Sequence, residues 1–416
     1  MANKQRHTNI KSEEGQSLIE IVVALAVGSI LIGAAVVGIV LVLRSGAVNQ
    51  KSETASSLAR DLLLRARSVA DADWAAISTV EKGPDFLYYV AASGTELAVV
   101  RGEEGVTTDA PSMGLVARWG FDESIGDILH NALPNGTAGR AFGTSYSASC
   151  RVGGCRVFNG SGDLIFFGND PALNLQNAFT LSLWMRASEI PSFPDTGLLS
   201  KGGLRYGLTY NNDGNVWFYV GDKTNATRAP VSPGGWHHVA GVFDGSSPAP
   251  MLRLYIDGIA VATTTSSFSL SGAEGDLVIG QYNSNYFSGR IDDVRVYDRA
   301  LAPTEVYALY NGSVFTRSLT LERVYRNPAG EIVSPGGTED PSTIETSARV
   351  RWVPSGSSEA NFELKDYLTR WRNEVFHQTD WSSGPEPLSP SPEPGGGYSN
   401  SSNILFSPGE IRINEL

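Results

Sequence analysis

Two cysteines are the residues of this chain with the most evident chemistry. Cys150 and Cys155 are its only cysteines, and the four residues between them, Arg-Val-Gly-Gly, end in two glycines. Glycine enters turn conformations at little steric cost, so this segment can fold back and bring both sulfur atoms within bonding distance. In an oxidising compartment the spacing predicts a disulfide. The alternative is a pair of free buried thiols, and a zinc site would need further cysteines.

Acid–base chemistry has two adjacent candidates, His237 and His238, in a segment that alternates like a β-strand. Neighbouring strand residues point to opposite faces of a sheet, so the two imidazoles cannot act together on one substrate. The sequence also lacks the Gly-x-Ser-x-Gly turn of serine hydrolases, a Walker loop and the His-Glu-x-x-His helix of metallopeptidases. The residues therefore predict a protein that is not an enzyme.

Residues 281–287 combine aromatic and amide side chains in one short loop, with Tyr282, Asn283 and Tyr286 as its most prominent members. Aromatic rings beside polar groups are suited to hold a sugar, which has both apolar and hydroxyl-bearing faces. This loop is the best candidate for contact with a glycan. The alternative is that its rings belong to the hydrophobic core, as most aromatic residues of a β-rich domain do.

The composition favours a turn-rich, mainly β protein that does not bind nucleic acid. The chain has 416 residues, enough for two domains besides a helical segment, and contains 45 glycines and 21 prolines. Its formal net charge is −12 and its isoelectric point is about 5.0. Phosphate backbones are bound by clustered Lys and Arg, so this charge argues against nucleic acid as a partner.

The N-terminal region places a short polar segment before a long apolar run. Gly15, Gln16 and Glu20 precede residues 21–43, which contain no charged residue and no proline. These residues would form a helix about 34 Å long, enough to cross a bilayer core. Apolar residues at three- and four-residue spacings then continue the helical pattern over residues 46–69.

This order of segments resembles the leader of type IV prepilins and pseudopilins, in which a peptidase cuts after a glycine and a glutamate is the fifth residue of the mature chain. Gly15 and Glu20 fit that pattern, while Gln16 stands where the family usually has phenylalanine. The resemblance implies cleavage by a prepilin peptidase between Gly15 and Gln16. It also implies that the helix packs against other pilins and that Glu20 pairs with the N-terminal amine of a neighbouring subunit.

The N-terminus has two alternative roles, a plain single-pass membrane anchor and a secretory signal cleaved after Ser45, Gly46 and Ala47. The apolar part of a secretory signal spans only about 7–15 residues, which is shorter than this run. Arg44 also interrupts the approach to that cleavage point. Both roles therefore fit less well than that of a prepilin leader.

The central part of the chain is a succession of short β-type runs with turn signals between them, such as the Asp257-Gly258 pair. Four ordered motifs, at residues 115–123, 157–163, 236–240 and 290–297, resemble the laminin-G-like, concanavalin A-like jelly roll. The fold class that we expect is mainly β with one long N-terminal α-helix, in which a β-sandwich jelly roll interrupts a pilin-like α+β domain.

The segments on either side of the jelly roll are predicted to be two halves of one pilin-like domain, because neither half alone could close a sheet against the helix. The jelly roll would then be an insertion in a host loop, which chains tolerate when the ends of the guest lie close together. The predicted divisions are 1–15 leader, 16–69 packing helix, 70–113 first pilin half, 114–312 jelly roll, 313–381 second pilin half and 382–416 a tail rich in Pro, Ser and Gly.

The jelly-roll resemblance implies a possible cofactor, calcium, because rim loops of such domains often supply oxygen ligands to it. By position within the matching motifs, the candidate ligands are Asn159, Asp163 and Asp292. The alternative is that these carboxylates accept hydrogen bonds from turn backbones. Enzymes on this fold carry carboxylates alternating along one strand, and no Glu-x-Asp-x-x-Glu strand occurs here.

Together these features predict a minor pilin or pseudopilin of a type IV pilus or related secretion filament, with a jelly roll that binds surface glycans or matrix proteins in adhesion. Before assembly it would span the cytoplasmic (inner) membrane once, and afterwards it would lie in an extracellular filament. One alternative is a structural pseudopilin of a type II-like secretion system whose insert binds nothing. Another is a membrane-anchored, carbohydrate-active ectodomain.

Overall fold

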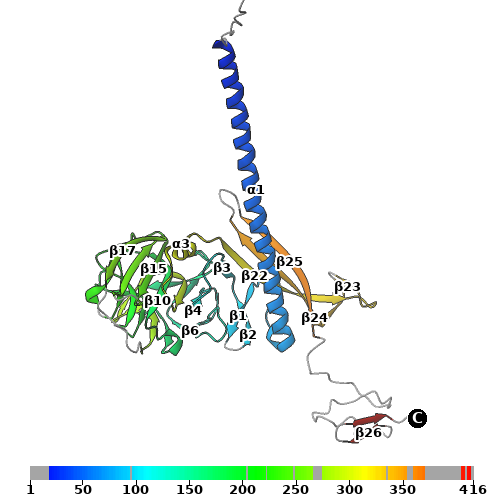
Figure 1. Ribbon diagram of the computed structural model, residues 1–416. Helices are drawn as coiled ribbons and strands as arrows, with labels where there is room; N and C mark the ends of the chain where they lie inside the picture. Colours follow the sequence, from blue (N-terminus) through cyan, green and yellow to red (C-terminus); the bar gives the residue numbers. More distant parts are fainter. Residues whose placement is uncertain are drawn as a thin grey trace, which may run out of the picture.

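The computed structural model divides the chain into a long helix, a sheet that packs on this helix and a two-sheet sandwich (Figure 1). The described residues are 18–93, 96–202, 205–221, 223–246, 249–265, 274–333, 336–353, 359–370, 404–407 and 410–413. The predicted leader, residues 1–15, and most of the predicted tail, 382–416, lie outside them.

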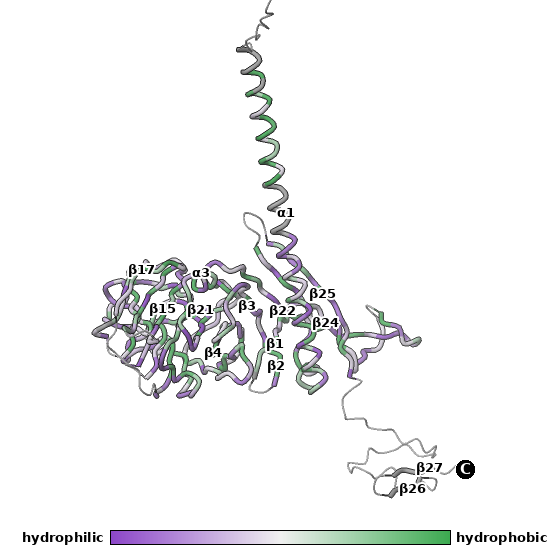
Figure 2. Tube along the Cα trace, viewed as in Figure 1, coloured by the Kyte–Doolittle hydropathy of each residue, from purple (hydrophilic) through white to green (hydrophobic). Residues whose placement is uncertain are grey.

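Helix α1, Leu18–Ala72, has 55 residues and two parts with different surroundings. Its first part stands clear of the body and is hydrophobic (Figure 2), with Leu25 69% and Ile30 70% exposed. In its second part, small and apolar side chains such as Ala55, Leu62 and Val69 are buried at helical spacing. Within the described part of the chain, no helix is long and apolar enough for a membrane span.

The sheet beside α1 is built from segments far apart in the sequence. Its strand order is β2-β1-β22-β24-β25, with β3 and β23 also paired to β22. The apolar side chains of Leu319, Ile344 and Ala348 pack with the buried stripe of α1 in one core. The elements are α2 (Trp74–Ser78), β1 (Tyr88–Ser93), β2 (Glu96–Arg101), β3 (Glu104–Thr107), β22 (Val314–Arg326), β23 (Ile332–Val333), β24 (Thr338–Trp352) and β25 (Ala360–Thr369).

The sandwich consists of two antiparallel sheets whose facing side chains form the largest core. The first sheet, ordered β17-β16-β15-β10-β21-β8-β7 with β4 on β21, contains β4 (Leu115–Trp119), β7 (Ser145–Ser147), β8 (Cys155–Asn159), β10 (Ala178–Ala187), β15 (His237–Asp244), β16 (Met251–Ile256), β17 (Ile259–Thr265) and β21 (Ser288–Tyr297). At its centre the ring of Phe179 lies 4.8 Å from Tyr206 and 5.4 Å from Phe243, measured between centroids.

The second sheet faces the first and has the order β14-β13-β12-β11-β18-β9-β6-β5. Its strands are β5 (Ile128–Leu129), β6 (Gly139–Phe142), β9 (Leu164–Gly168), β11 (Thr196–Lys201), β12 (Tyr206–Tyr210), β13 (Asn215–Val220), β14 (Thr227–Pro230) and β18 (Leu277–Ile279). The hairpin β19 (Gln281–Tyr282) and β20 (Asn285–Tyr286) is separate from both sheets.

The chain enters and leaves the sandwich side by side. The N–H of Thr108, just after β3, donates to the carbonyl of Ser313, just before β22, at 2.9 Å. Helix α3 (Pro303–Asn311) brings the chain back from β21 to this point. The predicted fold class, a mainly β chain with one long N-terminal helix and a jelly-roll sandwich, is therefore confirmed. Far along the chain, β26 (Ile404–Ser407) and β27 (Glu410–Ile413) pair with each other.

Candidate functional site

The predicted ligand loop is a hairpin that folds over the outer face of the second sandwich sheet. Its two turn residues, Asn283 and Ser284, have φ of +46° and +65°, as a tight hairpin turn requires. The hairpin lies so close to β11 that a Cβ atom on Gly197 would be 2.2 Å from the carbonyl oxygen of Gln281. The hydroxyl of Ser200 also donates to that oxygen at 3.2 Å.

Tyr282 lies beneath this hairpin and packs on the sheet, since only 3% of its surface is exposed. Its ring is 5.8 Å from that of Tyr219 on β13. The ammonium of Lys223 lies 4.3 Å from the centre of the Tyr282 ring and 5.1 Å from that of Tyr219. Such cation–π contacts hold a charged side chain at a fixed place on the surface.

Lys223 also connects this aromatic pair to a carboxylate. Its Nζ donates to Asp195 Oδ1 at 2.5 Å and to the hydroxyl of Thr209 at 3.2 Å. Burial lowers the pKa of Lys223, although Asp195 acts in the opposite direction. The salt bridge is only partly exposed and is therefore less screened by solvent than an ordinary surface pair.

Trp217 extends the same face along β13. Val216 and Phe218 point into the core, so the alternation of the strand puts Trp217 and Tyr219 together on the outer side. The Arg228 guanidinium lies 4.6 Å from the Trp217 ring, and the indole N–H donates to Asp213 Oδ2 at 3.3 Å.

We call this surface the Lys223 face and define it by Asp195, Trp217, Lys223, Asn283 and Tyr286. Trp217 and Tyr286 are half-buried and Asn283 is exposed. Phe193, two residues before Asp195, is 57% exposed. The three predicted loop residues therefore differ in exposure. Tyr282 is buried beneath the Lys223 face, while Asn283 and Tyr286 reach the surface. Contact of this loop with a sugar stays a prediction.

Two of the three predicted calcium ligands lie together in the turn between β8 and β9. Asp163 Oδ2 accepts the N–H of Asn159 at 2.8 Å, and Asn159 Oδ1 accepts the N–H of Ser161 at 2.7 Å. Both side chains thus satisfy the backbone of their own turn, which is the alternative role expected for short polar side chains.

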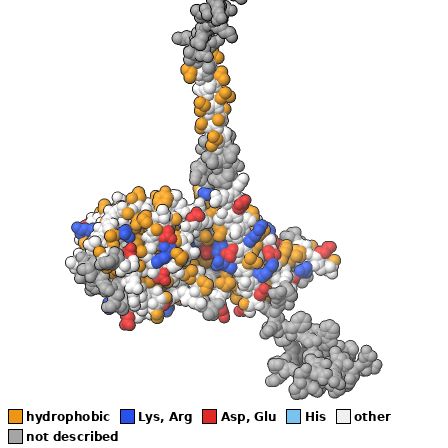
Figure 3. Space-filling view, viewed as in Figure 1, with side chains coloured by type: hydrophobic (Ala, Val, Ile, Leu, Met, Phe, Trp, Pro, Cys, Tyr) orange, Lys and Arg blue, Asp and Glu red, His pale blue; other side chains and the backbone are white. Residues whose placement is uncertain are grey.

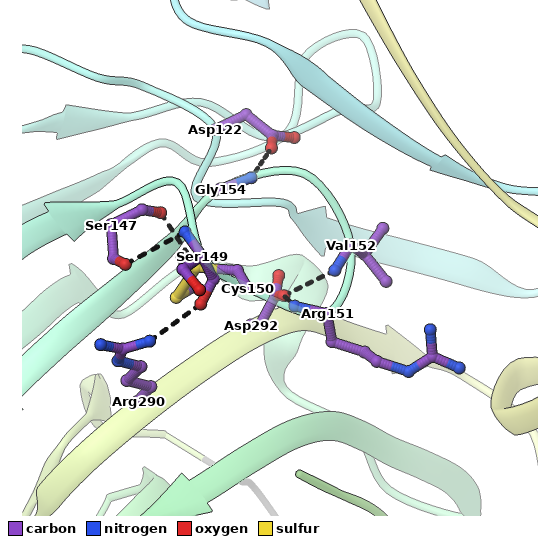
Figure 4. Close-up of a disulfide and its surroundings, with 10 residues drawn as sticks. Asp122, Ser147, Ser149, Cys150, Arg151, Val152, Gly154, Arg290 and Asp292 are labelled. Carbon is purple, nitrogen blue, oxygen red and sulfur yellow. Dashed lines mark hydrogen bonds between the residues drawn. A yellow bond between two sulfur atoms is a disulfide. The ribbon is translucent and has the colours of Figure 1, made fainter. Parts of the chain in front are cut away.

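Asp292 lies apart from that pair, on β21. Its Oδ2 accepts the N–H groups of Arg151 and Val152, each at 2.9 Å (Figure 4). Burial and the neighbouring Asp293 raise the pKa of Asp292 well above its ordinary value. No group of three or more His, Cys, Asp or Glu side chains is placed to hold a metal ion in the described ranges. Calcium binding stays a prediction.

The predicted disulfide between Cys150 and Cys155 is present. The loop that it closes is held at several points: Arg290 Nη1 donates to the carbonyl of Ser149 at 2.8 Å, and the N–H of Gly154 donates to Asp122 Oδ1 at 2.6 Å (Figure 4). Asp122 and Asp292 are both buried, so two buried carboxylates hold the disulfide loop by accepting hydrogen bonds from its main-chain N–H groups.

The predicted processing and assembly residues fall at the edge of the described chain. Gly15 and Gln16 lie outside the described residues, and Glu20 belongs to α1 with a side chain that is outside them as well. The histidine pair has separate surroundings, because His237 contacts Asp257 at 2.9 Å while His238 contacts Ser182 at 2.9 Å on the other side of β15.

Sequence reasoning did not identify Asp195, Trp217 and Lys223. The alternation of β13 places Trp217 and Tyr219 on one face, but the sequence does not say whether that face is inside or outside the sandwich. Lys223 and Asp195 lie 28 positions apart, and neither belongs to a motif. Only the pairing of the strands brings them together.

Comparisons with known proteins identify two parts of the chain. A model of the prokaryotic N-terminal methylation motif matches residues 10–36. A model of the concanavalin A-like lectin/glucanases superfamily matches residues 159–307. A search of curated proteins finds no relative that matches this chain.

Solved structures similar to this chain have low sequence identity to it. Domain 4 of an extracellular GH43 arabinanase from Geobacillus stearothermophilus, solved with arabinotriose, is 21% identical with a TM-score of 0.40, over 47% of this chain and 98% of that one. The botulinum neurotoxin serotype D ligand-binding domain, solved with N-acetylneuraminic acid, is 10% identical with a TM-score of 0.40, over 56% and 70%. Trypanosoma rangeli sialidase is 17% identical with a TM-score of 0.38, over 48% of this chain and only 33% of that one. The methylation motif and the jelly roll together match a prepilin-type protein with an inserted concanavalin A-like domain.

Proposed function

We propose that this chain is a minor pilin-like subunit whose jelly roll binds glycans at the Lys223 face and serves in adhesion. The methylation motif supports processing by a prepilin peptidase after Gly15 and assembly with other pilins. The apolar first part of α1 supports the same role, because side chains such as Leu25 and Ile30 need a covering that the other described residues do not provide. A membrane before assembly and neighbouring helices afterwards would provide it.

The observation that carries the glycan proposal is the composition of the Lys223 face. Trp217 and Tyr286 present aromatic surface, and the hydrophobic sides of sugar rings pack on such surfaces. Asp195, Lys223 and Asn283 lie beside them and offer both hydrogen-bond donors and acceptors to sugar hydroxyls. The cation–π contacts and the salt bridge fix Lys223 in advance, which reduces the entropy lost on binding.

Binding is favoured over turnover by the state of the carboxylates on this face. A glycosidase needs a protonated acid of raised pKa opposite a second carboxylate. Asp195 is paired with Lys223. Burial opposes ionisation of Asp213, but hydrogen bonds from Asn215 and Trp217 outweigh it and lower its pKa. Asp213 is therefore not suited to donate a proton to a leaving sugar.

The bulk of the jelly roll supports a minor subunit. The sandwich projects sideways from the lower part of α1 (Figure 1), and a module of this size on every subunit would crowd a helical filament. A position at the tip, or sparse decoration along the filament, avoids that crowding and exposes the Lys223 face to a target surface.

A glycan array probed with the purified full-length chain in detergent micelles tests the binding proposal. Wild-type protein should bind a defined set of glycans, and Trp217→Ala and Lys223→Met should each weaken that binding about tenfold, or about 1.4 kcal/mol. Phe142→Ala is the matched control, since it removes an exposed aromatic ring from another part of the same sheet. Silence of the wild-type protein on every glycan would refute the proposal and favour the structural pseudopilin.

Cleavage of the leader between Gly15 and Gln16 is tested separately from glycan binding. Mass spectrometry of the N-terminal peptide, from cells that contain a prepilin peptidase, should give a mature chain beginning at Gln16. The Gly15→Val variant should keep its leader. A wild-type chain that begins at Met1, or at a residue after Ala47, would contradict assignment to the prepilin pathway.

A further inference from the structure

A cleft with a volume of about 650 Å³ lies between the disulfide loop and the sheet beside α1. One wall carries Lys51 from α1 with Arg351 and Trp352 from β24, and the other carries Tyr146 and Arg151 from the jelly roll. Ligand sites often lie between domains, and volumes of about 300–1,000 Å³ are typical of small-molecule sites. The cleft is separate from the Lys223 face, with which it shares no lining residue.

The charges in the cleft are not balanced. Arg351 is already paired, with Glu103 at 2.6 Å and Glu359 at 3.3 Å. Lys51 and Arg151, by contrast, have no carboxylate partner among the residues that the structure describes. The Arg151 guanidinium lies 4.6 Å from the centre of the Trp184 ring, and its side chain points away from the disulfide (Figure 4). Two cations are therefore available to an anionic ligand.

Several neutral groups in the cleft also lack partners. Over the described part of the chain, no hydrogen bond is made by the side chains of Tyr146, Asn311 or Thr316, all of which line the cleft. Burial raises the pKa of Tyr146 to about 12, so its hydroxyl remains a donor at neutral pH. Trp352 is only 7% exposed, and its indole N–H is buried without a partner in the same residues.

The jelly-roll wall of the cleft is fixed in advance. The disulfide closes the loop, Asp292 accepts the main-chain N–H of Arg151, and Arg290 holds the carbonyl of Ser149. A preformed wall loses little entropy when a ligand binds. The opposite wall is equally constrained, because Arg351 lies on a strand that is paired on both sides, with β22 and with β25.

We propose that this cleft binds a sugar that carries a carboxylate, such as a uronic-acid unit. The carboxylate would lie near Lys51 and Arg151, and the sugar ring would pack beside Tyr146. Asn311 and Thr316 would hydrogen-bond to its hydroxyls. A planar guanidinium and an ammonium suit a carboxylate, while the aromatic ring and the neutral polar groups suit a sugar better than a bare anion. The site is distinct from the glycan site proposed at the Lys223 face and does not depend on it.

Isothermal titration of the full-length chain with trigalacturonate tests this assignment. Its fully methyl-esterified form is the matched neutral probe, because it keeps the sugar rings and removes the charges. Wild-type protein should bind trigalacturonate at least tenfold more tightly than the ester, and added salt should weaken the charged interaction. Lys51→Gln and Arg151→Gln should each weaken trigalacturonate binding about tenfold, whereas Arg140→Gln, which removes a positive charge outside the cleft, should leave it unchanged.

Several results would overturn the assignment. They are no binding of trigalacturonate, equal binding of the ester, binding by both cleft variants that equals that of wild type, and displacement by inorganic phosphate at the same concentration as the sugar. Melting temperatures of the variants, measured alongside, separate lost binding from lost folding. Trp217→Ala distinguishes the two proposed sites: it should not change trigalacturonate binding, and a loss in this variant alone would move the charged sugar to the Lys223 face.

Discussion

At the residue scale, the jelly roll buries a group of charged side chains on the outer side of its first sheet. Asp293 accepts from Arg118 Nε at 2.8 Å and from Arg295 Nε at 3.0 Å, and all three residues are buried. Burial opposes the charge of Asp293, but Arg295 and Arg118 outweigh it and lower its pKa to about 2. A buried charge is tolerated when such partners satisfy it.

His238 belongs to the same surface and is predicted to make stability depend on pH. It is fully buried, and desolvation is the main cause that lowers its pKa to about 4. The unfolded chain has a histidine pKa of about 6.5, so between about pH 6.5 and pH 4 this side chain is protonated in the unfolded state and neutral in the folded state. As the pH falls from about 6.5 to about 4, His238 should therefore lower the free energy of unfolding by about 3 kcal/mol.

Urea unfolding of wild type and His238→Gln at pH 4.5, 5.5 and 7 measures this contribution. The difference in unfolding free energy between the two proteins should change with pH in the direction that favours the variant in acid. Asp122 and Asp292, whose pKa values are raised by burial, act in the opposite direction in both proteins and cancel in the comparison. A constant difference at all three pH values would show that His238 is not the group responsible.

At the element scale, one buried arginine connects the helix to the sheet. Arg317 on β22 donates to Asp61 on α1 at 2.7 Å and to Glu104 on the neighbouring strand β3 at 2.8 Å. Its side chain is 3% exposed. The same residue thus joins the second part of α1, the strand before the jelly roll and the strand after it.

Arg317→Met is expected to destabilise the fold by about 3 kcal/mol, because it removes a buried guanidinium and leaves the Glu104 carboxylate, which is only 12% exposed, without its partner. Arg349→Gln is the matched control. Its pair with Glu363 lies on the surface, so its loss should cost less than about 1 kcal/mol. Denaturant unfolding curves of wild type and the two variants measure both losses of unfolding free energy. Similar costs for the two substitutions would contradict the special role of Arg317.

The sequence predicted the helices and strands better than the long-range contacts between them. Apolar spacing in α1 and the short β-type runs of the central region predicted a helix and strands, because those patterns depend on neighbouring residues only. The disulfide followed from a five-residue separation. The hydrogen bonds from Arg151 and Val152 to Asp292 span about 140 positions, and no local pattern encodes such a contact. For this reason the sequence did not predict that Asp292 accepts hydrogen bonds from the disulfide loop.

At the scale of the whole molecule, the jelly roll and the apolar part of the helix are separated in space. Hydrophobic side chains follow the upper part of α1, while charged side chains gather on the body (Figure 3). The sandwich lies beside the lower part of the helix (Figure 1). Helices could therefore pack together through their upper parts while the jelly roll stays outside the packing.

The jelly roll is docked directly on the sheet, and Gly105 is one of the points of close approach between them. A Cβ atom on Gly105 of β3 would lie 2.5 Å from the carbonyl carbon of Val152 in the disulfide loop. Gly105→Ala should therefore push the loop away and loosen the junction without entering the sandwich core. Gly235→Ala is the control, since a Cβ there meets only His237 Nε2, at 3.5 Å.

Limited proteolysis measures this loosening. Cleavage between residues 108 and 114, where the chain passes from sheet to sandwich, should be faster in Gly105→Ala than in wild type and unchanged in Gly235→Ala. Equal cleavage rates in all three proteins would mean that the close contact at Gly105 does not hold the jelly roll in place.

Filaments sheared from cells and applied to a panel of immobilised glycans, with detection of this chain on them, test assembly and adhesion together. Cells would produce either the wild-type chain or the Trp217→Ala, Lys223→Met double variant. If the chain is an adhesive minor pilin, both chains should enter the filament fraction, and wild-type filaments should bind particular glycans while variant filaments do not. Absence of the wild-type chain from the filaments, or identical binding by both, would contradict that role.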